Sequence, residues 1–466
     1  MIGYAFRMLT GKSPMQKKLR QHFRGQSMEG IVTAARTFPL ASRVDVQLAI
    51  DRFFLERAKP ELLGIHSAVG HETSTLAHLL VRGPFPVDIG PLQHDDIDVG
   101  EPTSVRCLKN GLWLSSDQDL PFALLLSPAM QYGTVGGVHV ELAVPQGESG
   151  LKFSQQFFSD LESAVNVGGT YRGRVISLES HRDYSGRGGA VKVHRLHGVR
   201  REEVILPNKT LALLDRNIAD FIRAREHIKS LGLSAKKGLL FYGPPGTGKT
   251  HTIHYLASQL PQHTTLLITA EQVGLLDEYF RLARFLQPSM VIVEDVDLIA
   301  RAREQMGGAC EEVLLNKLLN EMDGLREDAD VIFILTTNRP DQLEPALASR
   351  PGRIDQAIEF PLPDEQGRSK LIKLYARGLQ LPDELLDLMV RRTKGASPAF
   401  IKELMRRAAQ FQFEAKAGGQ LGKSAFDGAI EEMVFSGGAL NLKLLGGSSP
   451  ELGSTEETLM RPLRAQ

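Results

Sequence analysis

Residues 243–250 read GPPGTGKT, a glycine-rich stretch that follows an apolar run and precedes a segment with helical periodicity. The spacing fits G-x-x-x-x-G-K-[ST], in which backbone N–H groups turn inward around phosphate oxygens. Lys249 would bring a positive charge to the outer phosphates, and Thr250 offers a hydroxyl to magnesium. A helix that begins here directs the positive end of its dipole at the same anion. The stretch therefore predicts a nucleotide phosphate site.

Two further apolar runs end in polar residues of the kind that such a site uses. Residues 290–297, MVIVEDVD, predict a buried parallel strand whose acids emerge at the carboxyl edge of a sheet. One acid can hold magnesium and the next can polarise a water, or the acids can cap the following helix. Residues 331–338, VIFILTTN, predict a second such strand. Its Asn338 can orient the water or serve as a turn residue before Pro340.

Two arginines, Arg350 and Arg353, bracket a Pro-Gly turn in residues 348–355, ASRPGRID. Two guanidinium groups this close are hard to bury without partners, so one interpretation is a solvated loop. The functional interpretation is an arginine finger that stabilises charge on a transferred phosphoryl group. The sequence leaves open which molecule's phosphate that would be.

The order of predicted elements indicates the fold class. Strands alternate with helices from residue 238 to residue 336, which predicts parallel βαβ units in a doubly wound α/β sheet. Helical periodicity continues through residues 364–436, and the preceding part of the chain mixes helices and strands in an α+β pattern. The expected domains are an α+β N-terminal domain over 1–200, an α/β nucleotide domain over 201–363, a helical lid over 364–436 and a disordered tail over 437–466.

Composition narrows the classes of partner. The 466 residues include 55 basic and 55 acidic side chains, so no basic excess indicates nucleic acid as the principal partner. The two cysteines, Cys107 and Cys310, cannot form a disulfide framework. No apolar run approaches the ~20 residues of a spanning helix, and the first residues lack a signal-peptide pattern. We therefore expect a cytoplasmic protein without a transmembrane segment.

Two groups in the N-terminal region could suggest metal ligands. His66, His71 and His78, with Glu72, do not have HExxH spacing, and scattered polar helix residues are the favoured interpretation. The acidic run from His94 through Asp98 is interpreted as a loop in preference to a cation cage.

Taken together, the motifs resemble the AAA branch of the AAA+ ATPases over residues 204–434. The resemblance carries GPPGTGKT, VIVEDVD, LLNEMDGL, VIFILTTN, LASRPGRID and TKGASPAFIKEL. It implies a P-loop nucleotide domain with a helical lid, in a homo-oligomeric ring that is most often hexameric, with ATP and Mg²⁺ at the subunit interfaces. The ATP-binding residues that it implies are Gly243, Pro244, Pro245, Gly246, Thr247, Gly248, Lys249, Thr250 and His251, with Gly395 and Ala396 near the adenine.

The resemblance also assigns roles around the transferred phosphate. It implies magnesium at Thr250 and Glu294, water activation by Asp295 and a sensor role for Asn338. Arg350 and Arg353 would reach the neighbouring subunit's γ-phosphate. The positions that carry signals between subunits would be Asp323, Gly324 and Leu325.

Two features depart from most of that family. The acids stand in the order Glu294-Asp295, whereas Asp-Glu is usual, and Asp295 is one methylene shorter than the usual base. We therefore expect slow hydrolysis as one outcome, although the order resembles the mitochondrial AAA translocase that assembles the Rieske protein. Residues 271–289 are short for a polypeptide-gripping loop, and Tyr279 and Phe280 are expected in a core or an interface.

Two functions follow as hypotheses. The first is an ATP-hydrolysing, ring-forming remodeller that acts on a protein client. The second is a nucleotide-dependent scaffold or switch that turns over slowly and recruits a partner. A P-loop kinase or GTPase is disfavoured, because no N-K-x-D pattern accompanies the glycine-rich loop.

Overall fold

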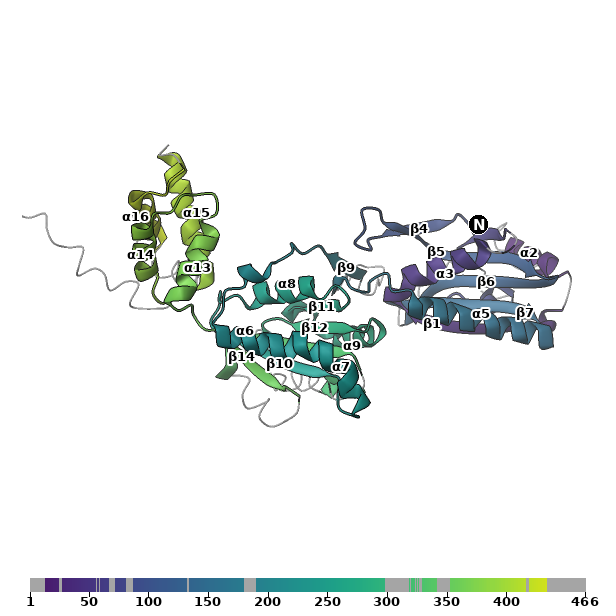
Figure 1. Ribbon diagram of the computed structural model, residues 1–466. Helices are drawn as coiled ribbons and strands as arrows, with labels where there is room; N and C mark the ends of the chain where they lie inside the picture. The colour runs from purple at the N-terminus through teal and green to yellow at the C-terminus, as the bar shows by residue number, and fades with distance from the viewer. Residues whose placement is uncertain are drawn as a thin grey trace, which may run out of the picture. The chain divides into compact units, whose positions relative to one another are not determined.

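A computed structural model gives the architecture of most of the chain (Figure 1). The residues that it describes are 13–24, 27–55, 57, 59–66, 72–80, 87–131, 134–179, 190–297, 318, 320–322, 324, 326, 329–341, 353–415 and 419–433. Arg350, Asp323, Leu325 and His71 lie outside these residues, as does the expected tail. The chain divides into two compact units, Met1–Arg195 and Leu196–Gln466, and each is described by itself.

The first unit is built on a mainly antiparallel sheet. Its strand order is β1-β7-β6-β5-β2-β3, and β4 pairs with β5 beside that path. A separate antiparallel pairing joins β8 (Val175–Glu179) to β9 (Ala190–His194). The strands of the sheet are β1 (Ile31–Pro39), β2 (Glu61–His66), β3 (Asp88–Gly90), β4 (Gln93–Ile97), β5 (Val105–Asp117), β6 (Leu120–Gln131) and β7 (Thr134–Pro145).

Helices cover both faces of this sheet, which explains the continuous apolar run along β6. Ala123 and Leu125 pack with α2 (Pro14–His22) and α4 (Leu76–Leu80) in one buried cluster. On the other face Phe122 lies against aromatic rings from α3 (Arg43–Leu55) and α5 (Glu148–Val167). A strand that is buried on both faces has no reason to alternate apolar and polar residues.

Some expectations for this unit were wrong. The acidic run is not a loop, because residues 93–97 form β4 and pair in register with β5. Of the histidines expected on helices, His66 instead ends β2, whereas His78 does lie in a helix, α4. Within the described residues, no group of three or more His, Cys, Asp or Glu side chains is placed to hold a metal ion. Cross-strand pairing with β5, which local sequence does not encode, decides the conformation of the acidic run.

The second unit holds the doubly wound α/β fold. In its described part five parallel strands lie in the order β14-β10-β13-β12-β11. Because β10 is flanked by β13 on one side and β14 on the other, the segment that follows β10 starts where the strand order reverses. The strands are β10 (Lys237–Tyr242), β11 (Thr264–Ile268), β12 (Ser289–Val293), β13 (Val331–Thr337) and β14 (Gln356–Glu359).

Helices lie on both faces of the parallel sheet. Leu239 and Phe241 of β10 pack in one buried cluster with side chains from α6 and α8. On the opposite face Phe333 of β13 stacks on Phe280 of α9. Tyr279 and Phe280 are fully buried, which confirms that they belong to the core. The helices are α6 (Asn208–Leu214), α7 (Phe221–Ser230), α8 (Lys249–Gln259) and α9 (Leu276–Phe285), with a π-helical turn, η4 (Asp215–Asp220), joining the first two.

The helical lid follows the sheet within the same unit. It comprises α13 (Glu365–Tyr375), α14 (Asp383–Arg392), α15 (Pro398–Glu414) and α16 (Lys423–Glu431), which enclose one apolar core. Ser397 caps α15 by accepting a hydrogen bond from the Phe400 N–H, and Pro398 occupies the first turn. Across the described part of the chain, no helix has the length and apolar character needed to cross a membrane.

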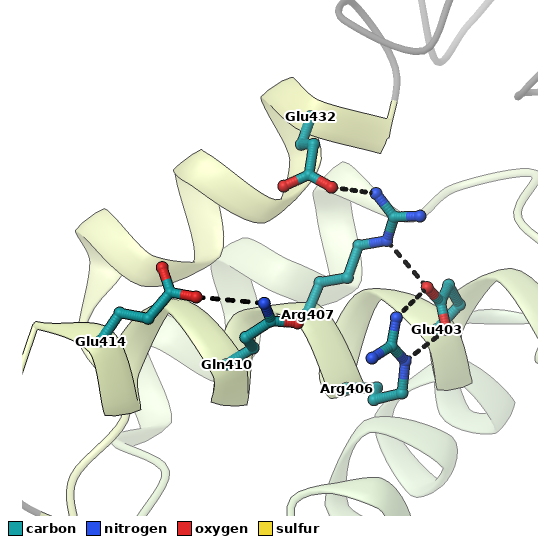
Figure 2. Close-up of polar contacts among 6 residues, drawn as sticks. All are labelled: Glu403, Arg406, Arg407, Gln410, Glu414 and Glu432. Carbon is teal, nitrogen blue, oxygen red and sulfur yellow. Dashed lines mark hydrogen bonds and ion pairs between the residues drawn. The ribbon is translucent and has the colours of Figure 1, made fainter.

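A carboxylate–arginine network joins neighbouring segments of the lid (Figure 2). Glu403 accepts hydrogen bonds from Arg406 at 2.7 and 2.8 Å and from Arg407 at 2.8 Å. Arg407 also pairs with Glu432, which ties α15 to the residue that follows α16. The hydrogen bonds from Arg406 lower the pKa of Glu403 from 4.5 to about 2.

Substitution of Gly238 tests the close packing of β10 against the backbone that leads into β14. A Cβ atom at this position would stand 2.0 Å from the Arg353 carbonyl oxygen. We expect Gly238→Ala to displace the start of β14 and lower the free energy of unfolding by about 1–3 kcal/mol, measured by urea unfolding. Gly419→Ala is the control, because a Cβ there meets nothing within 4 Å. An equal loss in both variants would contradict the packing argument.

Glu403 predicts a pH dependence of stability. Its folded pKa lies below the unfolded value, so its contribution is complete above about pH 4.5 and is lost as the pH falls toward 2. We expect Glu403→Gln to lower stability at neutral pH by less than about 1 kcal/mol, because the network is exposed. The difference from wild type should shrink as urea unfolding is repeated at lower pH. In Glu414→Gln, where the carboxylate accepts from the neutral amide of Gln410, no comparable change is expected.

Candidate functional site

The ends of three parallel strands converge at the carboxyl edge of the second unit's sheet. The glycine-rich loop, residues 243–250, follows β10, while Glu294 and Asp295 follow β12 and Asn338 follows β13. Gly246 and Gly248 have φ of 77° and 98°, a region that side chains with a Cβ disfavour. A Cβ on Gly243 would lie 2.2 Å from the Phe360 carbonyl oxygen, so this loop position also requires glycine for close packing.

The ammonium group of Lys249 is buried against three oxygens. Its Nζ donates to the carbonyl oxygens of Gly243 and Pro244 at 2.7 and 3.0 Å, and to Asn338 Oδ1 at 2.8 Å. Lys249 is 7% exposed. Desolvation lowers its pKa from 10.5 to about 8, although the nearby Asp295 and Asp297 carboxylates favour the charged form.

Asn338 joins the lysine to the acidic strand end. While its Oδ1 accepts from Lys249, its Nδ2 donates to Asp295 Oδ1 at 3.0 Å. Asp297 Oδ1 accepts from the Asn338 N–H at 3.1 Å and from Thr337 Oγ1 at 2.8 Å, which fixes the backbone of this corner. The carboxamide therefore holds the cation and the carboxylate at opposite ends of one side chain.

Asp295 combines an unusual backbone with a perturbed carboxyl group. Its φ is 48°, a left-handed conformation that costs a non-glycine residue free energy. The Asp295 N–H donates to Thr336 Oγ1 at 2.9 Å, which helps to maintain this conformation. Burial raises the pKa of the Asp295 carboxyl, and the Asp297 carboxylate raises it further, against the lowering effects of Lys249 and Asn338. A carboxyl group with a raised pKa is suited to accept a proton.

Two hard oxygen donors lie together beside this network. Thr250 Oγ1 donates a hydrogen bond of 2.8 Å to Glu294 Oε1, so a hydroxyl and a carboxylate from different elements face the same point. Magnesium in nucleotide sites is bound by one or two such protein oxygens, together with phosphates and water. The donor set at Thr250 and Glu294 fits that requirement.

A cavity of about 380 Å³ opens in front of the glycine-rich loop. Asp295 and Asn338 line it on the sheet side, and residues 203–206 and the lid line it elsewhere. The Ala399 N–H donates to the Gly246 carbonyl oxygen at 3.1 Å, so the first turn of α15 contacts the loop directly. The size and the polar end of the cavity suit a nucleotide.

The structure brings together most of the residues that the sequence singled out. Residues 245–251, including His251, line the cavity, and the Gly243 and Pro244 carbonyl oxygens bind Lys249. From the described part of the lid the lining residues are Leu371, Tyr375, Pro398, Ala399 and Lys402, and the expected adenine-side positions Gly395 and Ala396 are not among them. Ala396 is fully buried in the lid core.

Arg353 lies away from this cavity. Its carbonyl approaches Gly238 near the start of β10, whereas the glycine-rich loop follows the other end of that strand. The described lining residues of the cavity do not include it. Arg350, Asp323 and Leu325 lie outside the described residues.

Sequence reasoning missed several contributors to the site. The sequence motif that ends β12 includes Asp297, but no role was predicted for it. Its position two residues after Asp295 could have indicated that it lies at the same strand end. Tyr375 and Lys402 come from lid helices, and nothing in their local sequence indicates a nucleotide cavity. Their participation depends on how the lid packs against the loop.

Comparison with known proteins agrees with this geometry. Residues 239–362 match the model of the ATPase family associated with various cellular activities (AAA). The proteasome-activating nucleotidase of Methanocaldococcus jannaschii is 33% identical over 243 residues, which cover 50% of this chain and 56% of that protein. The chain thus spans about half the length of this curated relative.

Two other relatives match a similar part of the chain. The cell division cycle protein 48 homolog of Archaeoglobus fulgidus is 36% identical over 193 residues, covering 40% of this chain and 26% of that protein. The 26S proteasome regulatory subunit S10B homolog B of Arabidopsis thaliana is 34% identical over 198 residues, covering 40% and 49%. The family match includes the glycine-rich loop, both polar strand ends and Arg353. The chain therefore carries an ATPase domain of the AAA family.

Proposed function

We propose that this protein hydrolyses ATP and uses the reaction to remodel a protein client. The observation that carries the proposal is the hydrogen-bonded series from Lys249 through Asn338 to Asp295. In this proposal the series supplies a cation for phosphate, a polar sensor and a catalytic base around one cavity. Asp295 combines a raised carboxyl pKa with a strained backbone conformation beside the phosphate site. Such features are typical of catalytic residues and are not required for ATP binding alone.

In the proposed reaction each group has one task. The loop N–H groups and Lys249 bind the phosphates, and Lys249 leaves its three oxygen ligands to do so. Asp295 accepts a proton from the attacking water, and Asn338 orients that carboxylate. Thr250 and Glu294 would hold Mg²⁺, which supplies charge neutralisation on the phosphate oxygens. The adenine of ATP would pack against the cavity wall formed by residues 204–206, Leu371 and Tyr375.

Arg353 belongs to a neighbouring site in this proposal. It lies away from its own chain's cavity, yet an arginine finger must contact the phosphate that is transferred. Arg353, and Arg350 beside it in sequence, would complete the cavity of the adjacent subunit in a homo-oligomeric ring, for which a hexamer is the expected size. Hydrolysis would then require assembly.

The remaining assignments are also proposals. We propose a protein client in the cytoplasm, with no principal role for nucleic acid, in line with relatives that are named for proteasome activation and regulation. The domain division at 1–200, 201–363, 364–436 and 437–466 stays a prediction. So do the adenine-side positions Gly395 and Ala396 and the intersubunit positions Asp323, Gly324 and Leu325.

A second candidate is a switch that binds ATP, turns over slowly and recruits a partner. The observation that favours it is the short, conformationally strained Asp295, whose amide partner also serves Lys249. Steady-state ATPase measurements on the full chain separate the two. Sustained turnover that a client accelerates supports remodelling. Hydrolysis limited to about one ATP per subunit over hours, with ATP still promoting assembly, supports the switch.

Complementation between two inactive variants tests the shared site. Arg353→Ala is expected to lower kcat about 10³-fold with ATP binding retained, because the finger acts on transferring charge. Asp295→Asn is expected to lower kcat about 10²–10⁴-fold by removing the base. In an equal mixture, about a quarter of the interfaces would pair an intact Asp295 with a neighbour's intact Arg353, so activity should reappear.

The control for this experiment is Arg223→Ala, which removes an exposed arginine of α7 that pairs with Asp220. When Arg223→Ala is mixed with Asp295→Asn, the ATPase activity should not exceed that expected from the Arg223→Ala subunits alone. Normal turnover by Arg353→Ala, or no recovery in mixtures that demonstrably exchange subunits, contradicts hydrolysis between subunits.

Asn338→Ala tests the link between Lys249 and Asp295. Because Asp295 loses its orienting donor, we expect kcat to fall about 10–100-fold. Because Lys249 loses a competing acceptor, we expect ATP affinity to stay within about threefold of wild type or to increase. Single-turnover ATPase rates and fluorescent-nucleotide titrations measure the two effects. Asn217→Ala, which removes an amide that donates to the Leu213 carbonyl within a helix, is the control. A large loss of affinity with unchanged kcat would contradict the assigned role.

A further inference from the structure

The first unit contains a cavity of about 440 Å³ for which the ATPase proposal has no use. It lies among β4, β5, β6, β7 and the start of α3, with β9 closing one side. Its volume falls in the range of small-molecule sites, about 300–1,000 Å³. Most of its wall is apolar, with Leu40, Val44, Ile97, Leu126, Val138 and Val191 among the lining residues.

Two cations meet at the polar end of this cavity. Arg43 Nη2 lies 3.0 Å from Asp95 Oδ2, and Lys109 Nζ lies 3.1 Å from Asp95 Oδ1. All three side chains line the cavity and are at most one-third exposed. One carboxylate thus holds a guanidinium and an ammonium side by side, with one positive charge in excess.

Both cations retain unused hydrogen-bond donors. Within the described part of the chain, the recorded polar contacts of Arg43 all use Nη2, which donates to the Leu108 carbonyl oxygen at 2.9 Å as well as meeting Asp95. Nε and Nη1 of Arg43 are therefore available. Lys109 uses one of its three donors on Asp95. Both oxygens of Asp95 are occupied, so the polar end offers donors and not acceptors.

The other carboxylates at the cavity do not reverse this balance. Asp96 pairs with Arg106 at 3.2 Å, and Asp98 lies 3.6 Å from Arg195 Nη2. Burial raises the pKa of Asp95, but the hydrogen bonds from Arg43 and Lys109 outweigh burial and leave that pKa below its ordinary value. Asp95 is consequently ionised at neutral pH, and a cationic ligand would meet Arg43 and Lys109 first.

We propose that this cavity binds a small amphipathic carboxylate, with its apolar group against the β6–β7 wall and its carboxylate on Arg43 and Lys109. An apolar wall with two cations at one end matches an anion that carries a branched or linear hydrocarbon group. Charge-assisted hydrogen bonds to both cations would fix its orientation. Two sources share this chemistry: a free carboxylic acid and the carboxyl terminus of a polypeptide that ends in an apolar residue.

The proposal explains a cluster that serves stability poorly. A partly buried Arg–Asp–Lys group with excess cation stabilises a fold less than an apolar replacement of similar volume would. Its position at one end of an apolar cavity gives it a use. This site is independent of the nucleotide cavity, so its test does not depend on ATP hydrolysis.

The experiment is a ligand-observed NMR titration of the full-length protein with four matched probes. These are 4-methylpentanoate, its neutral isostere 4-methylpentanamide, the peptide acetyl-Ala-Ala-Leu with a free carboxyl terminus, and the same peptide as an amide. We expect saturable binding of at least one carboxylate, and at least about tenfold weaker binding of its amide. Tighter binding of the free acid identifies a small-molecule ligand, and tighter binding of the peptide identifies a polypeptide terminus.

Three variants locate the binding. Lys109→Gln removes one cation but leaves the Arg43–Asp95 pair intact, and should weaken carboxylate binding at least about tenfold. Val191→Trp fills the cavity from a half-buried strand position and should abolish binding of carboxylate and amide alike. Lys152→Gln is the control, because Lys152 and its partner Glu148 are exposed residues of α5 that do not line the cavity, so binding should be unchanged. Thermal unfolding confirms that each variant is folded.

Several outcomes would overturn the proposal. They are the absence of saturable binding by both carboxylates, equal affinity for acid and amide, and retention of full affinity in Val191→Trp. A Lys152→Gln variant that loses as much affinity as Lys109→Gln would reassign the effect to general surface charge, which also overturns the proposal.

Discussion

Burial of one ammonium group constrains the nucleotide site of this protein. Lys249 Nζ is removed from water and bound to three oxygens, two from its own loop and one from Asn338 at the end of β13. A buried charge is tolerated only when its hydrogen bonds are satisfied. The loop conformation, the end of β13 and, through Asn338, the carboxylate of Asp295 are therefore held by one group. In the proposed function phosphate oxygens would compete for the same donors, which would link nucleotide binding to the freedom of Asp295.

The lid takes part in this arrangement through backbone contact. The first turn of α15 donates to the Gly246 carbonyl oxygen, and lid side chains complete the cavity wall. The Glu403 network connects α15 to Glu432, which follows α16, so in the proposed function a displacement of α15 would be shared by its neighbour (Figure 2). In the proposed ring, such a displacement would be the route from phosphate chemistry to the rest of the assembly.

The first unit has its charged cluster beside an apolar cavity, apart from any glycine-rich loop. Its sheet is covered on both faces by helices, and within that apolar frame the Arg43–Asp95–Lys109 group is a concentrated set of charges at the edge of a cavity. Partly buried ions cost free energy unless they are well paired and hydrogen-bonded. The proposed carboxylate site at this cavity gives the first unit a role separate from ATP binding.

The sequence by itself determined the parallel strands, the glycine-rich loop and the polar strand ends, because each rests on local spacing and on periodic burial. It also predicted that Tyr279 and Phe280 lie in a core or an interface, and the structure places both in the core. Tertiary structure alone decided that the acidic run is a strand, that Asp297 braces Asn338, and that Tyr375 and Lys402 line the nucleotide cavity. Those outcomes depend on strand pairing and on helix packing between residues far apart in the chain. Local preference cannot specify such contacts, because the same short segment has a different lowest-energy state once a distant partner is in place.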